Sequence, residues 1–114
     1  MSMKSLIVLI FSFSSFIGFS QNNDLFTKAT EHYNQGEFSK AIENYEQILK
    51  NGKHSSELYF NLGNCHYKLN PIGPSIYYYE KALLLSPNDS EILNNLGYAQ
   101  NMRLDAIDEL PRTE

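Results

Sequence analysis

Apolar residues recur along most of this chain at intervals of three and four positions, which is the spacing of one face of an α-helix. Leu58, Leu62 and Leu69 show this spacing. The alternation at every second position that a half-buried strand would require does not appear. Glycine at 36 and proline at 71 and 87 interrupt the pattern and mark helix ends. We therefore expect an all-α protein with helices at residues 24–35, 38–50, 56–69, 74–85 and 90–103.

The first twenty residues follow a different pattern, because they are apolar on every side. Lys4 precedes an apolar run from Leu6 to Phe19, and small residues stand just before Gln21. This order is typical of a secretory signal peptide. The run is too short to cross about 30 Å of hydrocarbon at a rise of about 1.5 Å per residue. We expect residues 1–20 to be removed near Ser20/Gln21 and the mature chain to be exported to the periplasm or cell envelope.

The remaining sequence contains an internal repeat of 34 residues. Residues 22–55 align with residues 56–89 without a gap, and a third copy begins at Ser90 but continues for only one helix. Small residues recur at positions 8 and 20 of the repeat: Ala29, Gly63, Gly97, Ala41 and Ser75. Position 24 is aromatic in both complete copies, Tyr45 and Tyr79. Small side chains allow two helices of a hairpin to cross closely, and the aromatic rings fill the adjoining space.

With these residues at these offsets, the chain resembles the tetratricopeptide-repeat family, whose repeat also has 34 residues. The resemblance covers residues 22 to about 103. It implies a right-handed α-solenoid within residues 21–103, made of two helix-turn-helix repeats and a capping helix at residues 90–103. Residues 104–114, which are acidic and contain a proline, are expected to be a tail or linker. Because only two and a half repeats are present, we expect marginal stability.

The resemblance also implies that the first helix of each repeat lines a concave face that binds a segment of a partner polypeptide. Asparagine amides can pair with a peptide backbone, and Tyr and Phe supply stiff contact area. The residues placed in this groove by repeat position are Phe26, Thr30, Tyr33, Asn34, Phe60, Asn61, Asn64, Tyr67, Lys68, Asn94, Asn95, Tyr98 and Asn101. An average repeat of the family carries several of these residues, so ancestry alone is an alternative explanation for them.

One specialised kind of groove is not expected. Family members that clamp a terminal carboxylate carry Lys, Arg and Asn at five positions, and here only Asn61 matches; the other four hold Phe26, Thr30, Glu91 and Asn95. Without cations, the desolvated carboxylate would be uncompensated.

Charge and reactive residues argue against other functions. The net charge is −4 and there is no basic stripe, so we expect no binding of nucleic acid. His32 and His66 occupy the same repeat position on helices about 8–10 Å apart, too far to share a zinc ion. Cys65 is the only cysteine, so it is expected to pack as a small apolar residue, or to cross-link two chains if exposed. No nucleophile–base pair or phosphate loop is present. We therefore expect no enzyme activity, no metal, no cofactor and no small-molecule substrate.

Residues 56–89 and the segment AQNMRLDAIDELP resemble the N-terminal part of BatE-type proteins, exported repeat proteins of the Bacteroides aerotolerance operon. That resemblance implies a scaffold that binds another cell-envelope protein and meets the membrane only indirectly. The alternative is a structural module that stacks end to end with itself or with a longer repeat array.

Overall fold

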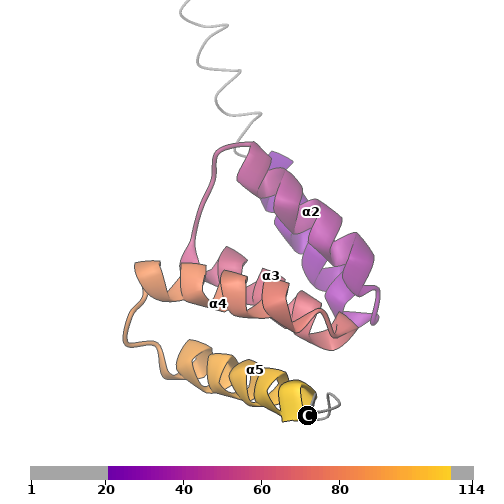
Figure 1. Ribbon diagram of the computed structural model, residues 1–114. Coiled ribbons are helices and arrows are strands. Elements are labelled where there is room, and N and C mark those ends of the chain that lie inside the picture. The colour runs from indigo at the N-terminus through magenta and orange to yellow at the C-terminus, as the bar shows by residue number, and fades with distance from the viewer. Residues whose placement is uncertain (1–20, 109–114) are drawn as a thin grey trace, which may run out of the picture.

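The computed structural model describes residues 21–108, and this part of the chain is entirely helical apart from short connections. A helical segment at residues 21–34 is followed by α2 (Phe38–Lys50), α3 (Ser56–Leu69), α4 (Ile72–Leu85) and α5 (Ser90–Asp108). Successive helices are packed side by side as hairpins, and α5 lies against α4 (Figure 1). No strand occurs among the described residues. The arrangement is an α-solenoid of two hairpins and one further helix.

The sequence predicted the bounds of α2 and α3, whereas the other helices are longer than expected. Residue 21 is already helical, and α4 begins at Ile72, which places Pro74 in its first turn, where a missing N–H is tolerated. Helix α5 continues to Asp108, so residues 104–108 are helical. Leu104 and Ala106 favour helix, and the next proline is Pro111. The expected signal peptide and residues 109–114 lie outside the described residues.

Local sequence explains where the helices start and stop. Gly36 adopts a φ of 78°, a left-handed conformation that glycine adopts at little cost, and it ends the first helical segment. The Ser55 side chain accepts a hydrogen bond of 3.1 Å from the Leu58 N–H at the start of α3. Asp89 caps α5, because its Oδ1 accepts from the N–H groups of Glu91 (3.0 Å) and Ile92 (3.1 Å). These side chains satisfy N–H groups that would otherwise have no partner in the first turn.

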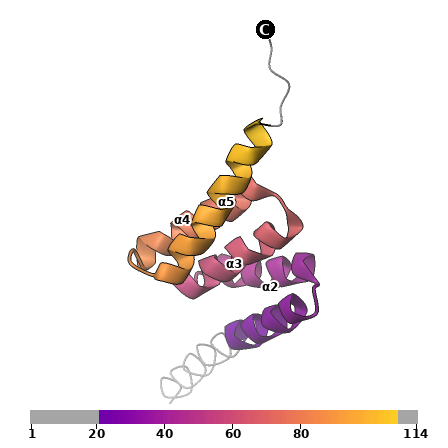
Figure 2. The ribbon, with the colours of Figure 1, turned by 90° about the horizontal axis from the view of Figure 1, so that it is seen from below.

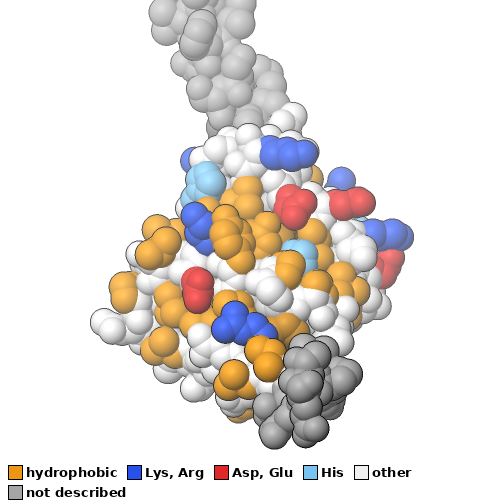
Figure 3. Space-filling model, in the orientation of Figure 1, with side chains coloured by type: hydrophobic (Ala, Val, Ile, Leu, Met, Phe, Trp, Pro, Cys, Tyr) orange, Lys and Arg blue, Asp and Glu red, His pale blue; other side chains and the backbone are white. Residues whose placement is uncertain are grey.

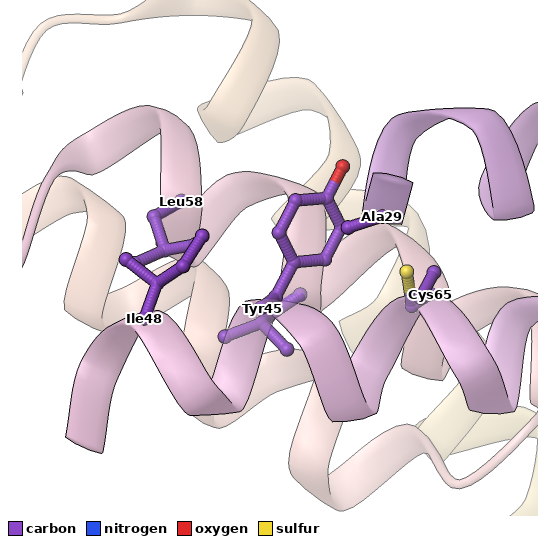
Figure 4. Close-up of a cluster of buried hydrophobic side chains, with 7 residues drawn as sticks. Ala29, Tyr45, Ile48, Leu58 and Cys65 are labelled. Atoms are coloured by element: carbon purple, nitrogen blue, oxygen red, sulfur yellow. The ribbon is translucent and has the colours of Figure 1, made fainter. Parts of the chain in front are cut away.

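The apolar faces form two clusters of buried side chains. One joins the first hairpin to α3 and consists of Ala29, Ala41, Tyr45, Ile48, Leu58, Leu62 and Cys65 (Figure 4). The other joins α4 to α5 and consists of Ile76, Tyr79, Ala82, Ile92, Leu96 and Ala99. Each cluster joins a hairpin to the first helix of the next repeat, so neither hairpin buries its apolar face alone. Figure 2 shows the same succession of helices from below.

Four of the five small residues of the repeat lie where the helices cross, as predicted. Ala29, Ala41 and Ser75 are fully buried, and Gly63 is buried against the ring of Tyr79. A Cβ atom at Gly63 would lie 2.5 Å from Tyr79 Cδ1, which is closer than real Cβ contacts allow. Gly97 differs, since a Cβ atom there would meet nothing within 4 Å. The close approach that the repeat predicted at Gly97 is therefore absent from the described part of the chain.

None of the helices within residues 21–108 has the length and apolar character needed to span a lipid bilayer. Hydrophobic side chains do reach the surface over α4 and α5 on the face shown in Figure 3.

Candidate functional site

Tyr79 connects the second hairpin to α5 through its hydroxyl group. The ring is 1% exposed, and its Oη donates a hydrogen bond of 2.6 Å to Asn64 Oδ1. Asn64 Oδ1 also accepts a hydrogen bond of 3.0 Å from Asn95 Nδ2. Burial raises the pKa of Tyr79 to about 12, so the hydroxyl remains a donor at neutral pH. One amide oxygen therefore holds α3, α4 and α5 in a fixed arrangement.

Tyr45 occupies the equivalent place in the first hairpin. Asn61 Nδ2 donates to Tyr45 Oη over 3.3 Å, and Tyr45 Oη lies 3.1 Å from Thr30 Oγ1. Thr30 Oγ1 also donates to the Phe26 carbonyl over 3.0 Å. Since a hydroxyl has only one proton, Thr30 must accept from Tyr45. Both repeats thus use a buried tyrosine in the same way. Its hydroxyl bonds the residue at position 9 of its own repeat, which is Thr30 or Asn64. The residue at position 6 of the next repeat then bonds either to that hydroxyl, as Asn61 does, or to the position 9 residue, as Asn95 does.

The asparagine network borders a pocket of about 260 Å³ between the helices. The first helical segment, α3, α4 and α5 all contribute to its lining: Tyr33, Asn64, Tyr67, Lys68, Tyr79, Asn95 and Tyr98. Lys68 is the only charged residue of this lining. The pocket, named here the Tyr98 pocket, is therefore surrounded by tyrosine rings, amide groups and one cation.

Six of the residues predicted for the groove line this pocket: Tyr33, Asn64, Tyr67, Lys68, Asn95 and Tyr98. Sequence reasoning missed Tyr79, which it treated as a filler of space because repeat position 24 is buried. The signal that could have identified it was the phenol group, since a buried tyrosine hydroxyl usually requires a hydrogen-bond partner.

The other predicted residues lie elsewhere. Phe26 borders a separate depression of about 330 Å³ beside Lys53 and Glu57, and Phe60 and Asn61 border a third of about 230 Å³ beside Asp89 and Glu91. Asn34, Asn94 and Asn101 are exposed and line none of these pockets, and Thr30 is bonded to Tyr45.

Phe26 and Phe60 also serve the core. The ring of Phe26 meets Tyr45 edge-on with centroids 5.5 Å apart, and Phe60 lies 5.9 Å from Tyr79. Such contacts stabilise the packing of the hairpins. Substituting Phe26 or Phe60 would therefore disturb the packing of the hairpins as well as any bound ligand.

His66 and Cys65 are packed against other side chains of the protein. Both ring nitrogens of His66 are buried without a hydrogen-bond partner, and its ring stacks on Tyr78 at 5.4 Å. Burial lowers the pKa of His66, so the ring is neutral at pH 7. His32 Nδ1 lies 3.5 Å from Glu37 Oε1, beyond the usual range of a strong hydrogen bond.

Cys65 is fully buried, and burial raises the pKa of its thiol to about 12. Within residues 21–108, no group of three or more His, Cys, Asp or Glu residues is placed to hold a metal ion.

Comparison with protein families agrees with this architecture. Three models described as tetratricopeptide repeat match residues 26–71, 56–89 and 78–109. Together these matches extend without a gap from residue 26 to residue 109, and one of them coincides with the second repeat at residues 56–89. The chain belongs to the tetratricopeptide-repeat family. A search of the curated proteins gave no match.

Tetratricopeptide repeats generally mediate protein–protein interaction and are not themselves catalytic. The Tyr98 pocket of this tetratricopeptide-repeat protein lies across several helices, and its lining comes from both repeats and from α5.

Proposed function

We propose that this tetratricopeptide-repeat protein binds an extended segment of a partner polypeptide, with one side chain of that segment held in the Tyr98 pocket. The convergence of Tyr33, Tyr67, Lys68, Asn95 and Tyr98 from three separate helices supports the proposal. Tyrosine is a frequent anchor in protein interfaces because it offers a large contact area at a low cost in conformational entropy.

The size of the pocket favours a single side chain over a free metabolite. Its volume of about 260 Å³ is smaller than the range of about 300–1,000 Å³ that is usual for small-molecule sites. Tyr98, at the edge of the pocket, is 62% exposed, so a bound polypeptide can continue past the pocket in either direction. An extended polypeptide meets both conditions.

Hydrogen-bonding groups of the pocket favour an acceptor. Asn64 Oδ1 already receives hydrogen bonds from Tyr79 and Asn95. The donors left to address a ligand are the Asn64 amide nitrogen, the hydroxyls of Tyr33, Tyr67 and Tyr98, and the Lys68 ammonium. The hydroxyls and Asn95 Oδ1 can also accept, whereas the Lys68 ammonium can only donate and is the one charged group of this lining. Backbone carbonyl groups and a carboxylate side chain are the matching acceptors. The bound segment is therefore proposed to carry an Asp or Glu beside its anchor residue.

Selection from a displayed peptide library tests this function. The best selected peptide is synthesised, and its affinity is measured for the wild-type protein, Tyr98→Ala and Tyr77→Ala. Tyr77 lies on α4, is 53% exposed and lines none of the three pockets, so it is a matched control. We expect Tyr98→Ala to weaken binding at least tenfold, or about 1.4 kcal/mol, and Tyr77→Ala to have no effect.

The peptide itself provides a second comparison. Replacing its carboxylate with an amide should weaken binding to the wild-type protein and have little effect on Lys68→Met. Equal losses for Tyr98→Ala and Tyr77→Ala, or selected peptides without acidic residues, would contradict the proposed site.

The proposed setting is the cell envelope, where this protein would act as a scaffold for other exported proteins. The signal-peptide pattern of residues 1–20 and the resemblance to BatE-type proteins support this setting. Mass spectrometry of the protein isolated from its native cells should give Gln21 as the first residue. A chain that keeps Met1 and is recovered from the cytosol would refute export.

A further inference from the structure

The two complete hairpins show what covers the first helix of a repeat. Repeat position 8 is buried in both hairpins, Ala29 in the first and Gly63 in the second. Position 4, four residues earlier, is half-buried in both, as Leu25 and Tyr59. At position 11, His66 stacks on Tyr78 of α4. The cover in each case is the second helix of the same hairpin.

Helix α5 has the same positions, but within residues 21–108 no second helix follows to cover them. Leu93, Gly97 and Gln100 are repeat positions 4, 8 and 11, and Leu104 and Ile107 continue the spacing of four and three residues. A spacing of this kind places all five on one helix face. Leu93, Leu104 and Ile107 are 46%, 56% and 55% exposed. These five residues are named the α5 seam, and no helix within residues 21–108 packs on it.

The two hairpins also show which features a covering helix has. Each second helix presents a small residue followed four positions later by a tyrosine: Ala41 and Tyr45 in α2, Ser75 and Tyr79 in α4. All four side chains are buried. The absence of a Cβ at Gly63 makes room for the Tyr79 ring, since a Cβ there would lie 2.5 Å from that ring. Gly97 leaves the same space on the α5 seam, where it is open.

We propose that the α5 seam binds an amphipathic helix from another polypeptide, one that presents a small residue and an aromatic residue four positions apart. The aromatic ring packs over Gly97, as Tyr79 packs over Gly63. Flanking apolar residues of the bound helix cover Leu93, Leu104 and Ile107. This recognition is of the helix-in-groove type, in which residues at helical spacing enter an apolar surface.

A second copy of this chain, added head to tail, does not fit the seam. Its leading surface would be the first helical segment, where positions 3, 7 and 10 are the exposed and charged Asp24, Lys28 and Glu31. In the second and third copies these positions hold apolar residues that are buried, among them Leu58 and Ile92. Covering the apolar seam with those charges would desolvate them without partners.

Binding of a defined helix tests the proposal. The probe is a fluorescein-labelled synthetic peptide with the sequence of residues 71–87, which includes α4, and its binding to the full chain is followed by fluorescence anisotropy. We expect saturable binding that Gly97→Leu weakens at least tenfold, because the leucine fills the space that the ring requires. We expect Gly97→Leu to leave the free chain folded, since a Cβ atom at this position meets nothing within 4 Å. Circular dichroism checks that the variant is folded.

Two matched substitutions distinguish binding at the α5 seam from nonspecific hydrophobic binding elsewhere on the surface. Leu104→Lys on the seam should weaken binding, whereas Leu84→Lys should not. Leu84 is 75% exposed, and its equivalent in the first repeat, Lys50, stays exposed although the next hairpin is present. A probe peptide with Tyr79→Ala should also bind at least tenfold more weakly. Equal affinity for both lysine variants would overturn the proposal.

A covalent version removes the cost of folding an isolated peptide. A copy of residues 70–89 is inserted after Arg103, the register in which Asn70 follows Leu69 in the second repeat, so this version tests the cover over Leu93, Gly97 and Gln100. We expect the thermal midpoint to rise, and the rise to disappear when Gly97→Leu is added. If the insertion leaves the midpoint unchanged and the peptide does not bind, the seam is not a helix-binding surface. If light scattering shows a wild-type dimer that Leu104→Lys dissociates, the occupant is a second copy and the proposed partner is wrong.

Discussion

Gly63 and Gly97 occupy the same position of the repeat but have different surroundings. The sequence predicted that both would allow a close helix crossing. Only Gly63 does so, because the ring of Tyr79 lies over it. At Gly97 the corresponding aromatic residue is not present within the described residues, and the glycine faces open space. The repeat predicts a residue's position correctly, yet its contact depends on whether the partner helix is there.

This difference gives opposite expected effects for the same substitution. Gly63→Ala should lower the free energy of unfolding by about 1–2 kcal/mol, because the buried Tyr79 ring cannot move away from the new methyl group. Gly97→Ala should raise it by about 0.5–1 kcal/mol through the better helix propensity of alanine. Urea unfolding followed by circular dichroism measures both. A stabilising Gly63→Ala would show that the crossing is looser than described.

Tyr79 illustrates what residue patterns do not reveal about the site. Its repeat position predicted burial, and the ring is buried. Its hydrogen bond reaches Asn64, whose Oδ1 also binds Asn95 from a different helix. That meeting depends on the angle at which α5 packs on α3 and α4, which spacing along the chain does not determine. The predicted groove residues were therefore split between one shared pocket and separate places.

Helices as units were more predictable than their ends. Helix α4 begins before Pro74 because proline is tolerated in a first turn, and α5 passes residue 103 because no breaker follows until Pro111.

The packing between elements carries a pH dependence that sequence could not indicate. His66 of α3 stacks on Tyr78 of α4, with Glu46 of α2 near enough to influence its charge.

Acid should weaken the contact between these helices. Burial lowers the pKa of His66 in the folded chain, so below about pH 6.5 the unfolded chain takes up this proton first. The contribution of His66 to stability is then complete above that pH, and it is lost as the pH falls through the lowered pKa of the folded chain. The urea midpoint should be lower at pH 5.5 than at pH 7.5, and His66→Phe, which keeps an aromatic ring at that position, should reduce the difference. An unchanged difference in His66→Phe would assign it to other groups.

At the scale of the whole molecule, residues 21–108 contain two apolar clusters, and the second hairpin contributes α3 to one and α4 to the other. The 34-residue repeat predicted this all-helical arrangement, because its small and aromatic positions specify how one hairpin packs on the next. A solenoid gains stability from each neighbouring repeat. With few repeats, the sum of these contributions is small.

We therefore expect a modest thermal stability for the free protein. Its unfolding midpoint should not lie far above about 65 °C, the upper part of the usual range for mesophilic domains. Differential scanning calorimetry on a monomeric sample measures it directly. A midpoint near 90 °C would show that the contacts between hairpins are stronger than their number suggests.

The enclosed thiol of Cys65 gives this protein an internal reporter of its own opening. It belongs to α3 yet lies in the cluster that also contains Ala29, Ala41 and Tyr45 of the first hairpin. A reagent can reach the sulfur only when that hairpin separates from α3, and the high pKa of the thiol suppresses reaction until then. Labelling rates would therefore measure how often the first hairpin detaches from α3, and oxidation of the sulfur would be limited to those moments.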